Sequence, residues 1–182
     1  MASFGNVTLD PATTADAVLL SNLLELYIHD LSDVFPSVKL GVDGRFGYSK
    51  LPLYWSEPDR RFAFIIKVDG QAAGFVLATR GSPVTEDPGT FDVAEFFVIR
   101  QYRRSGVGRR AAQLLWSHLP GKWTVRVSKG NPSALGFWRR TIAHVTSGGV
   151  AEFERPGTPN SWLVLAFEIN SECGDAASLP AG

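Results

Sequence analysis

The sequence predicts an α/β domain built on a mixed sheet, and three observations predict it. A chain of 182 residues suits one domain with a sizeable core. Strand-like apolar runs alternate with runs at helical spacing, in the order strand, helix, three strands, helix, strand, helix, two strands. The strand–helix–strand–helix run in the second half implies locally parallel pairing within the sheet. We expect one domain over residues 1–170 and a loose C-terminal tail over residues 171–182, which are mostly small and polar.

The first elements are a short strand and a helix. Residues 6–10, NVTLD, alternate as a strand. Residues 11–31 carry apolar side chains at helical spacing after two N-cap candidates, Thr13 and Thr14. Residues 32–60 show no clean period, but they contain the aromatic residues Phe35, Phe46, Tyr48, Tyr54 and Trp55. Because solvated linkers are poor in aromatic residues, we expect this stretch to be ordered and functional.

A hairpin and a central strand follow. Residues 61–68 and 71–80 are apolar and β-prone, and they flank Asp69-Gly70, a pair that suits the positive backbone angles of a type I′ turn. Residues 82–90 are expected to form a loop. The segment FDVAEFFVIR at 91–100 is apolar on both faces, which is typical of a central strand.

The second half alternates helices and strands. Asn131 as N-cap and Pro132 at the first helical position predict the start of the last helix. The Pro-Gly pair at 120–121 predicts the end of the helix before it. The expected elements are helix 107–118, strand 123–128, helix 131–141 and a closing strand pair at 150–154 and 161–169.

Charge is distributed unevenly along the chain. The formal net charge is zero, yet no Asp or Glu occurs between Glu95 and Glu152. The same interval holds ten basic residues: Arg100, Arg103, Arg104, Arg109, Arg110, Lys122, Arg126, Lys129, Arg139 and Arg140. Because solvated faces normally mix both signs, we interpret this segment as facing an anion; the alternative is a solvated basic face.

Several classes are disfavoured by composition. Cys173 is the only cysteine, and His29, His118 and His144 are not paired at ligand spacing, so we expect no disulfide framework and no metal site. The N-terminus lacks the pattern of a signal peptide, and no segment has the hydrophobicity of a membrane span. We therefore expect a cytoplasmic protein.

The segment VIRQYRRSGVGRRAAQLL places a glycine turn between a strand and a helix. Backbone N–H groups at such a helix N-terminus suit phosphate oxygens, and a Cβ would hold the phosphate away from them. A P-loop would need Lys-Ser/Thr after Gly108, where Arg109 and Arg110 stand instead. A dinucleotide fold would need an acid about twenty residues further on, but none occurs before Glu152.

A third design fits the turn. Arg103, Gly106 and Gly108 match the pattern Arg/Gln-x-x-Gly-x-Gly/Ala, which resembles the acetyl-CoA signature of the GNAT superfamily of N-acetyltransferases. The strand EFFVI before the turn and NPSALGFW at the last helix are also similar to this family. The resemblance covers residues 5–169 in topology and residues 92–138 in motifs. It implies the GNAT fold, in which a mostly antiparallel sheet is splayed at the acetyl-CoA site and carries helices on both faces.

The resemblance also implies the cofactor and its contacts. The cofactor is acetyl-CoA, or coenzyme A after transfer. The pyrophosphate would be bound at the loop formed by Arg103, Arg104, Ser105, Gly106, Val107, Gly108 and Arg109. The strand before the loop would pair with the pantetheine arm through Phe97, Val98 and Ile99. Positions in the family that approach the coenzyme correspond to Asn131, Ser133 and Phe137.

Acetyl transfer needs a neutral amine, so a base is expected near it. The strand offers Asp92 and Glu95, which alternation places on opposite faces unless a bulge intervenes. We favour Glu95, because an acid inside an apolar central strand is costly without a purpose; a salt-bridged structural acid is the alternative. Trp138 occupies the position where the family often has a tyrosine that protonates the thiolate, and an indole N–H is no useful acid. Tyr27, Tyr48, Tyr54, Tyr102 or water could replace it.

The substrate is expected at the first helix and the segment after it. Candidate residues are Tyr27, Asp30, Phe35, Tyr48 and Trp55. Acids with aromatics favour a polar, amine-bearing ring compound, and the first half is similar to aminoglycoside 2′-N-acetyltransferases of the kasugamycin-modifying type. The leading hypothesis is therefore acetylation of an aminoglycoside antibiotic, which would confer resistance.

Alternatives remain open. They are protein or peptide N-acetylation, a coenzyme-binding module without catalysis, and nucleic-acid binding by the arginines, which would show a steep salt dependence. We expect a small-molecule amine as partner, no nucleic acid or membrane, and a monomer or homodimer.

Overall fold

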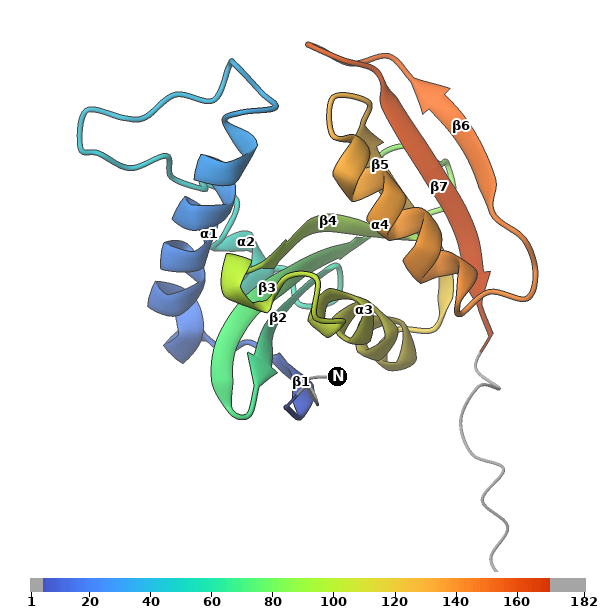
Figure 1. Ribbon diagram of the computed structural model, residues 1–182, viewed down its shortest axis with the longest axis horizontal. Helices are drawn as coiled ribbons and strands as arrows, with labels where there is room; N and C mark the ends of the chain where they lie inside the picture. The colour runs from blue at the N-terminus through green and yellow to red at the C-terminus, as the bar shows by residue number, and fades with distance from the viewer. Residues whose placement is uncertain (1–4, 171–182) are drawn as a thin grey trace, which may run out of the picture.

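The computed structural model describes residues 5–170, and it shows one seven-stranded sheet with helices around it (Figure 1). The strand order is β1-β2-β3-β4-β5-β7-β6, and every neighbouring pair is antiparallel except β4 and β5. The expected mixed, mostly antiparallel sheet is therefore confirmed. The strands are β1 (Val7–Pro11), β2 (Arg61–Val68), β3 (Gln71–Arg80), β4 (Phe91–Val98), β5 (Gly121–Ser128), β6 (Ala151–Arg155) and β7 (Trp162–Ile169).

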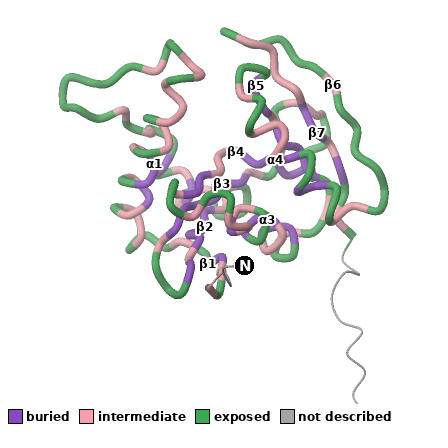
Figure 2. The backbone as a smooth tube through the Cα atoms, in the orientation of Figure 1, coloured by how far each residue is buried: buried purple, intermediate pink, exposed green. Residues whose placement is uncertain are grey.

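Helices cover both faces of the sheet, as expected. The helices are α1 (Ala17–Leu31), α2 (Leu53–Ser56), α3 (Val107–His118) and α4 (Pro132–Ala143), with two 3₁₀ turns, η1 (Thr14–Asp16) and η2 (Arg100–Tyr102). The α1–α2 face buries Leu20, Leu24 and Tyr54 against the sheet, whereas the α3–α4 face buries Leu115 and Ile142. Figure 2 shows the buried residues concentrated in the strands between these layers. No helix in residues 5–170 has the length and apolar character to cross a membrane.

Two local predictions are confirmed. Asp69 and Gly70 have φ angles of 49° and 79°, as a type I′ turn requires. The side-chain oxygen of Asn131 accepts a hydrogen bond from the N–H of Ala134 at 3.1 Å, so Asn131 caps α4. The short helix α2 was not predicted, and it lies within the aperiodic stretch of residues 32–60. The expected tail lies outside the described residues.

The strands β4 and β5 diverge. They are paired only where Phe91–Val93 lies beside Trp123–Val125, and the rest of each strand has no partner on that side. A gap thus opens through the middle of the sheet, toward the C-terminal ends of two parallel strands. Ligands in open sheets commonly bind at such ends, so this gap is the natural place for a site.

Candidate active site

A β-bulge in β4 decides which way its two acids face. Leu77 pairs with Glu95 and the next residue of β3, Ala78, pairs with Val93, so Ala94 has no partner on β3. Two residues three positions apart would ordinarily lie on opposite faces, but the extra residue brings Asp92 and Glu95 to the same side. Both acids line one hollow on the α1–α2 face. The sequence alone does not decide whether β4 contains a bulge, and the structure shows that it does.

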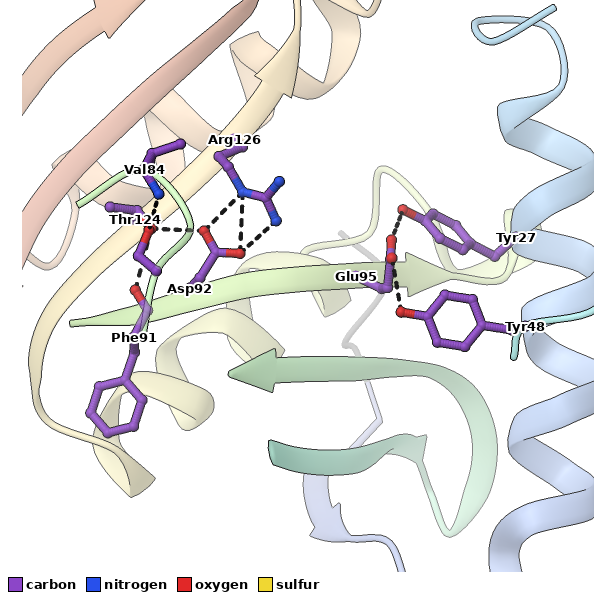
Figure 3. A network of polar contacts seen from close by, with 9 residues as sticks. Tyr27, Tyr48, Val84, Phe91, Asp92, Glu95, Thr124 and Arg126 are labelled. Atoms are coloured by element: carbon purple, nitrogen blue, oxygen red, sulfur yellow. Dashed lines mark hydrogen bonds and ion pairs between the residues drawn. The ribbon is translucent and has the colours of Figure 1, made fainter. Parts of the chain in front are cut away.

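Glu95 is bound by two tyrosine hydroxyls (Figure 3). Tyr27 Oη donates to one carboxylate oxygen at 2.7 Å, and Tyr48 Oη donates to the other at 3.1 Å. Burial raises the pKa of Glu95 above its ordinary value, although the two hydroxyls and the charges of Arg126 and Lys50 act in the opposite direction. A carboxylate that is satisfied by neutral donors and has a raised pKa is suited to accept a proton near neutral pH.

Asp92 has a different environment on the same strand (Figure 3). It is fully buried, and Arg126 on β5 binds both of its carboxylate oxygens, at 3.1 Å through Nε and at 2.7 Å through Nη2. The hydroxyl of Thr124 also donates to Asp92 at 2.7 Å. These contacts clamp β4 to β5 where the two strands separate. The carboxylate of Asp92 is thus an ion-pair partner, which favours Glu95 over Asp92 as the base.

The glycine turn presents backbone donors that have no acceptor. Gly106 has a φ of 87° and Arg104 a φ of 59°, and these left-handed angles turn the chain into the start of α3. Within residues 5–170 no acceptor is bonded to the backbone N–H groups of Arg104 through Arg109. A run of free N–H groups at a helix N-terminus fits the pyrophosphate of coenzyme A.

The basic segment divides into paired and unpaired side chains. Six of its ten cations form ion pairs with acids from other parts of the chain: Arg100 and Arg103 with Asp30, Lys122 with Asp87, Arg126 with Asp92, Lys129 with Glu154, and Arg139 with Glu152. The expectation that the whole segment faces an anion is therefore too broad. Among the described residues, Arg104, Arg109 and Arg110 around the turn form no ion pair, so this part retains the free positive charge.

Three hollows meet in sequence along β4. The loop hollow lies beside the glycine turn and is lined by Phe96, Val98, Arg103, Arg104, Gly106, Gly108, Arg109, Ser133, Ala134 and Phe137. The cleft hollow occupies the gap between β4 and β5 and shares Phe96 and Ala134 with the loop hollow. The acceptor hollow shares Lys50, Ala94, Glu95 and Arg126 with the cleft hollow. Its lining residues are Tyr48, Lys50, Tyr54, Glu57, Arg60, Arg61, Thr79, Arg80, Gly81, Pro83, Asp92, Ala94, Glu95 and Arg126. A passage thus connects the turn to Glu95 through the sheet.

The cleft hollow contains residues from both faces of the sheet. Tyr27 and Phe35 reach it from the α1 side, whereas Asn131 and Trp138 reach it from α4. The ring of Phe35 stacks on Trp162 of β7, with centroids 5.6 Å apart and planes 20° apart. This stack joins the segment after α1 to the far strand across the gap, which gives the cleft hollow a wall on its outer side.

Most predicted coenzyme residues lie along these hollows. Ser133, Phe137 and the loop arginines line the loop hollow, and Asn131 lines the cleft hollow. Val107 is buried beneath the turn with its side chain in the core. The backbone N–H of Ile99 donates to Ala73 on β3 at 2.8 Å, so it faces away from the gap. The Val98 carbonyl accepts from Arg103 Nε at 2.7 Å.

Two predicted substrate residues lie elsewhere. Asp30 pairs with Arg100 and Arg103 beside the turn and lines none of the three hollows. Burial alone would raise the pKa of Asp30, but hydrogen bonds from Arg103 and Arg100 outweigh burial and lower it. Trp55 is half-buried against the α1–α2 core and lines none of the three hollows, whereas its buried neighbour Tyr54 lines the acceptor hollow. Sequence reasoning missed Lys50, Arg60 and Arg126 as lining residues.

Trp138 forms the apolar wall of the cleft hollow. Its side chain is 6% exposed, and its ring packs edge to face on Phe96 and Phe137 at centroid distances of 5.0 and 4.9 Å. No hydroxyl is therefore present at this position, as the sequence indicated. Tyr27 is the tyrosine whose side chain lines the cleft hollow.

The split sheet, the free N–H groups and the buried acid are the features that acyl transfer from a phosphate-bearing coenzyme requires. Comparison with known families agrees. The model of the Acetyltransferase (GNAT) family matches residues 23–142, and the chain belongs to this family. The protein is an acetyl-CoA-dependent N-acetyltransferase, and acetyl-CoA supplies the acetyl group.

Solved structures show the same fold. Aminoglycoside acetyltransferase AAC(6')-Ib in complex with coenzyme A has a TM-score of 0.66 at 15% identity, over 90% of this chain and 95% of that one. An acetyltransferase from Thermus thermophilus has a TM-score of 0.60 at 17% identity, with 90% and 97% covered. The ribosomal-protein-S18-alanine N-acetyltransferase from Escherichia coli has a TM-score of 0.57 at 17% identity, over 96% of this chain and 100% of that one. No curated protein matches the chain.

Proposed function

We propose that the protein transfers an acetyl group from acetyl-CoA to a primary amine of a small polar molecule, which binds in the acceptor hollow. One observation carries this proposal: Glu95 lies where the acceptor hollow and the cleft hollow meet. An amine in the first hollow would face a thioester in the second, with the base beside both. The volume of the acceptor hollow, about 340 Å³, is in the range of small-molecule sites.

The coenzyme would lie along the loop and cleft hollows. The free N–H groups of Arg104 through Arg109 bind the pyrophosphate, and the side chains of Arg104 and Arg109 add positive charge beside it. Phe137 and Trp138 exclude water from the pantetheine arm. This assignment uses the loop that the sequence indicated, and it leaves Arg100 and Arg103 to hold Asp30.

Glu95 is the proposed base. An amine reaches the hollow as an ammonium ion and must lose a proton before it attacks. Glu95 Oε1 or Oε2 accepts that proton directly or through one water. Its raised pKa, caused by burial, makes this transfer more favourable than it would be to an exposed carboxylate.

Tyr27 is the proposed donor of the proton to the departing sulfur. It would take the role of the tyrosine that the family often has at the position of Trp138. Tyr27 lines the cleft hollow and donates to Glu95 at 2.7 Å. Burial and then the charge of Glu95 raise the pKa of Tyr27 well above its ordinary value. Once Glu95 has gained the amine proton its charge is gone, so Tyr27 can release its own proton and take that of Glu95.

The structure removes part of the support for an aminoglycoside as the substrate. That support depended on acids that would pair with ammonium groups, but Asp30, the acid among the expected substrate residues, is paired with Arg100 and Arg103 beside the turn. The likeness to the aminoglycoside acetyltransferase at 15% identity concerns the fold. Aminoglycosides, kasugamycin among them, therefore enter the test as one class of several, and resistance is an outcome of that test.

The test is turnover of amines by the purified protein. Thiol release from acetyl-CoA should be measured with aminoglycosides, polyamines, amino acids and peptides as acceptors. We expect a higher kcat/KM for a small-molecule primary amine than for any peptide. Efficient acetylation of peptide N-termini with no small amine accepted would overturn the proposal in favour of protein acetylation.

A further inference from the structure

The acceptor hollow contains more positive than negative charge. Five cationic side chains line it, against three carboxylates; the cations are Lys50, Arg60, Arg61, Arg80 and Arg126, and the acids are Glu57, Asp92 and Glu95. A site for a polycation would show the reverse balance, because like charges brought together in a hollow repel. The charge of the hollow thus carries information about the acceptor.

Pairing within the hollow leaves three cations without a carboxylate. Arg126 is bound to Asp92 at 2.7 Å, and Arg61 is bound to Glu57 at 2.8 Å. The third acid, Glu95, is bound by tyrosine hydroxyls. No ion pair within residues 5–170 engages the remaining cations, which are Lys50, Arg60 and Arg80.

The positions of two unpaired cations suit a ligand with one negative group. Lys50 lines both the acceptor and cleft hollows, and its charge acts on the pKa of Glu95. The guanidinium of Arg60 lies beside Gly81, where its Nη2 is 3.6 Å from the place a Cβ of Gly81 would occupy. Arg80 is less available, because its guanidinium lies 5.0 Å from the ring centroid of Phe91.

We propose that the acceptor is a small aminocarboxylate, such as an amino acid, whose amine faces Glu95 and whose carboxylate is bound by Lys50 and Arg60. This inference rests on the proposed function and adds the substrate class. A single anionic group would neutralise the excess charge of the hollow and would orient the amine toward the base. An amine without such a group would leave Lys50 and Arg60 without a counter-charge.

Matched pairs of acceptors test the inference. The purified protein with acetyl-CoA should be assayed for thiol release with phenylalanine against phenethylamine and with lysine against cadaverine, since each pair differs by the carboxylate. Kanamycin is the cationic comparison. We expect kcat/KM to be about 10-fold or more higher for the carboxylated member, as one charge-assisted hydrogen bond would give. Equal rates, or a preference for the decarboxylated amine or kanamycin, would overturn the inference and leave the acetyltransferase proposal intact.

Variants at exposed positions separate the two cations from the rest of the site. Lys50→Gln and Arg60→Gln should each raise KM for the carboxylated acceptor about 10-fold. In Arg60→Gln the KM for acetyl-CoA should be unchanged, because Arg60 lines the acceptor hollow and neither of the two hollows assigned to the coenzyme. The double variant Lys50→Glu/Arg60→Glu should reverse the preference within each pair. Arg140→Gln is the matched control, because Arg140 is an exposed arginine that lines none of the three hollows. Unchanged KM values in the first two variants would refute the assignment of the carboxylate subsite. No turnover with any amine would overturn both this inference and the proposed function.

Discussion

Replacing Glu95 by glutamine should lower kcat by about 10²–10⁴-fold and leave the fold at least as stable as the wild type at pH 7. Glutamine keeps the size of the side chain. It can accept a hydrogen bond from one tyrosine and donate one to the other, in place of the two bonds of 2.7 and 3.1 Å. It also removes a charge whose burial is unfavourable, as the raised pKa of Glu95 shows.

The pH dependence follows from the direction of that shift. Because the pKa of Glu95 is higher in the folded state, the folded protein keeps this proton at pH values where the unfolded chain has released it. The resulting stability is fully present below the unfolded pKa, near the ordinary value of 4.5, and is lost as the pH rises through the folded pKa. Each unit of difference is worth about 1.36 kcal/mol. Glu95→Gln should lack this loss.

Three measurements check the prediction. The acid limb of kcat/KM should lie above pH 4.5 in the wild type, because the base must be ionised, and should vanish in Glu95→Gln. Thermal denaturation from pH 4 to pH 8 should show the loss of stability with rising pH in the wild type and not in Glu95→Gln. Calorimetry should show that Glu95→Gln binds acetyl-CoA with unchanged affinity. A loss of kcat below 10-fold, together with a Tm several degrees lower at pH 7, would show that Glu95 is a structural acid and that the reasoning is wrong.

Three further predictions address neighbouring groups. Asp92→Asn should destabilise the fold by about 3–5 kcal/mol, measured by urea unfolding, because Arg126 would lose its buried partner; a change below 1 kcal/mol would contradict the clamp. Tyr27→Phe and Tyr48→Phe should both move the acid limb of kcat/KM to higher pH, because each hydroxyl lowers the pKa of Glu95. Only Tyr27→Phe should also lower kcat at its optimum pH. Equal losses of kcat in the two variants would exclude proton transfer through Tyr27. Arg104→Ala and Arg109→Ala should each raise the Kd for acetyl-CoA about 10-fold by calorimetry, against no change in Arg140→Ala; an unchanged Kd would place the phosphates elsewhere.

Local signals account for what could be predicted from the sequence. The Asp69-Gly70 turn, the Asn131 cap and the glycine turn each depend on a few adjacent residues, and the structure has all three. The same reasoning that favoured Glu95, an acid in an apolar strand, applies to Arg126 in WTVRVS. Applied there, it would have indicated a buried ion pair between neighbouring strands and a structural partner for Asp92.

The errors concern side chains whose direction depends on tertiary packing. Residues 32–60 have no period, so nothing in the sequence indicates which of Tyr54 and Trp55 faces the hollow. The short helix α2 sets that choice, and it packs the half-buried Trp55 against the core and turns the buried Tyr54 toward the hollow. Asp30 follows the helical pattern of α1, but its partners Arg100 and Arg103 lie 70 and 73 positions later in the sequence. A pair so distant in sequence leaves no local signal.

The bulge at Ala94 explains how one strand can hold two acids in different environments. Asp92 lies where β4 is still paired to β5, so an arginine from β5 can neutralise it. Glu95 lies beyond the point where the strands separate, and its donors are hydroxyls from α1 and from the segment before α2. Neutral donors satisfy a carboxylate without cancelling its charge, so burial dominates and the pKa rises. Two carboxylates in contrasting environments indicate separate roles, and here the contrast follows from one unpaired residue and the divergence of two strands.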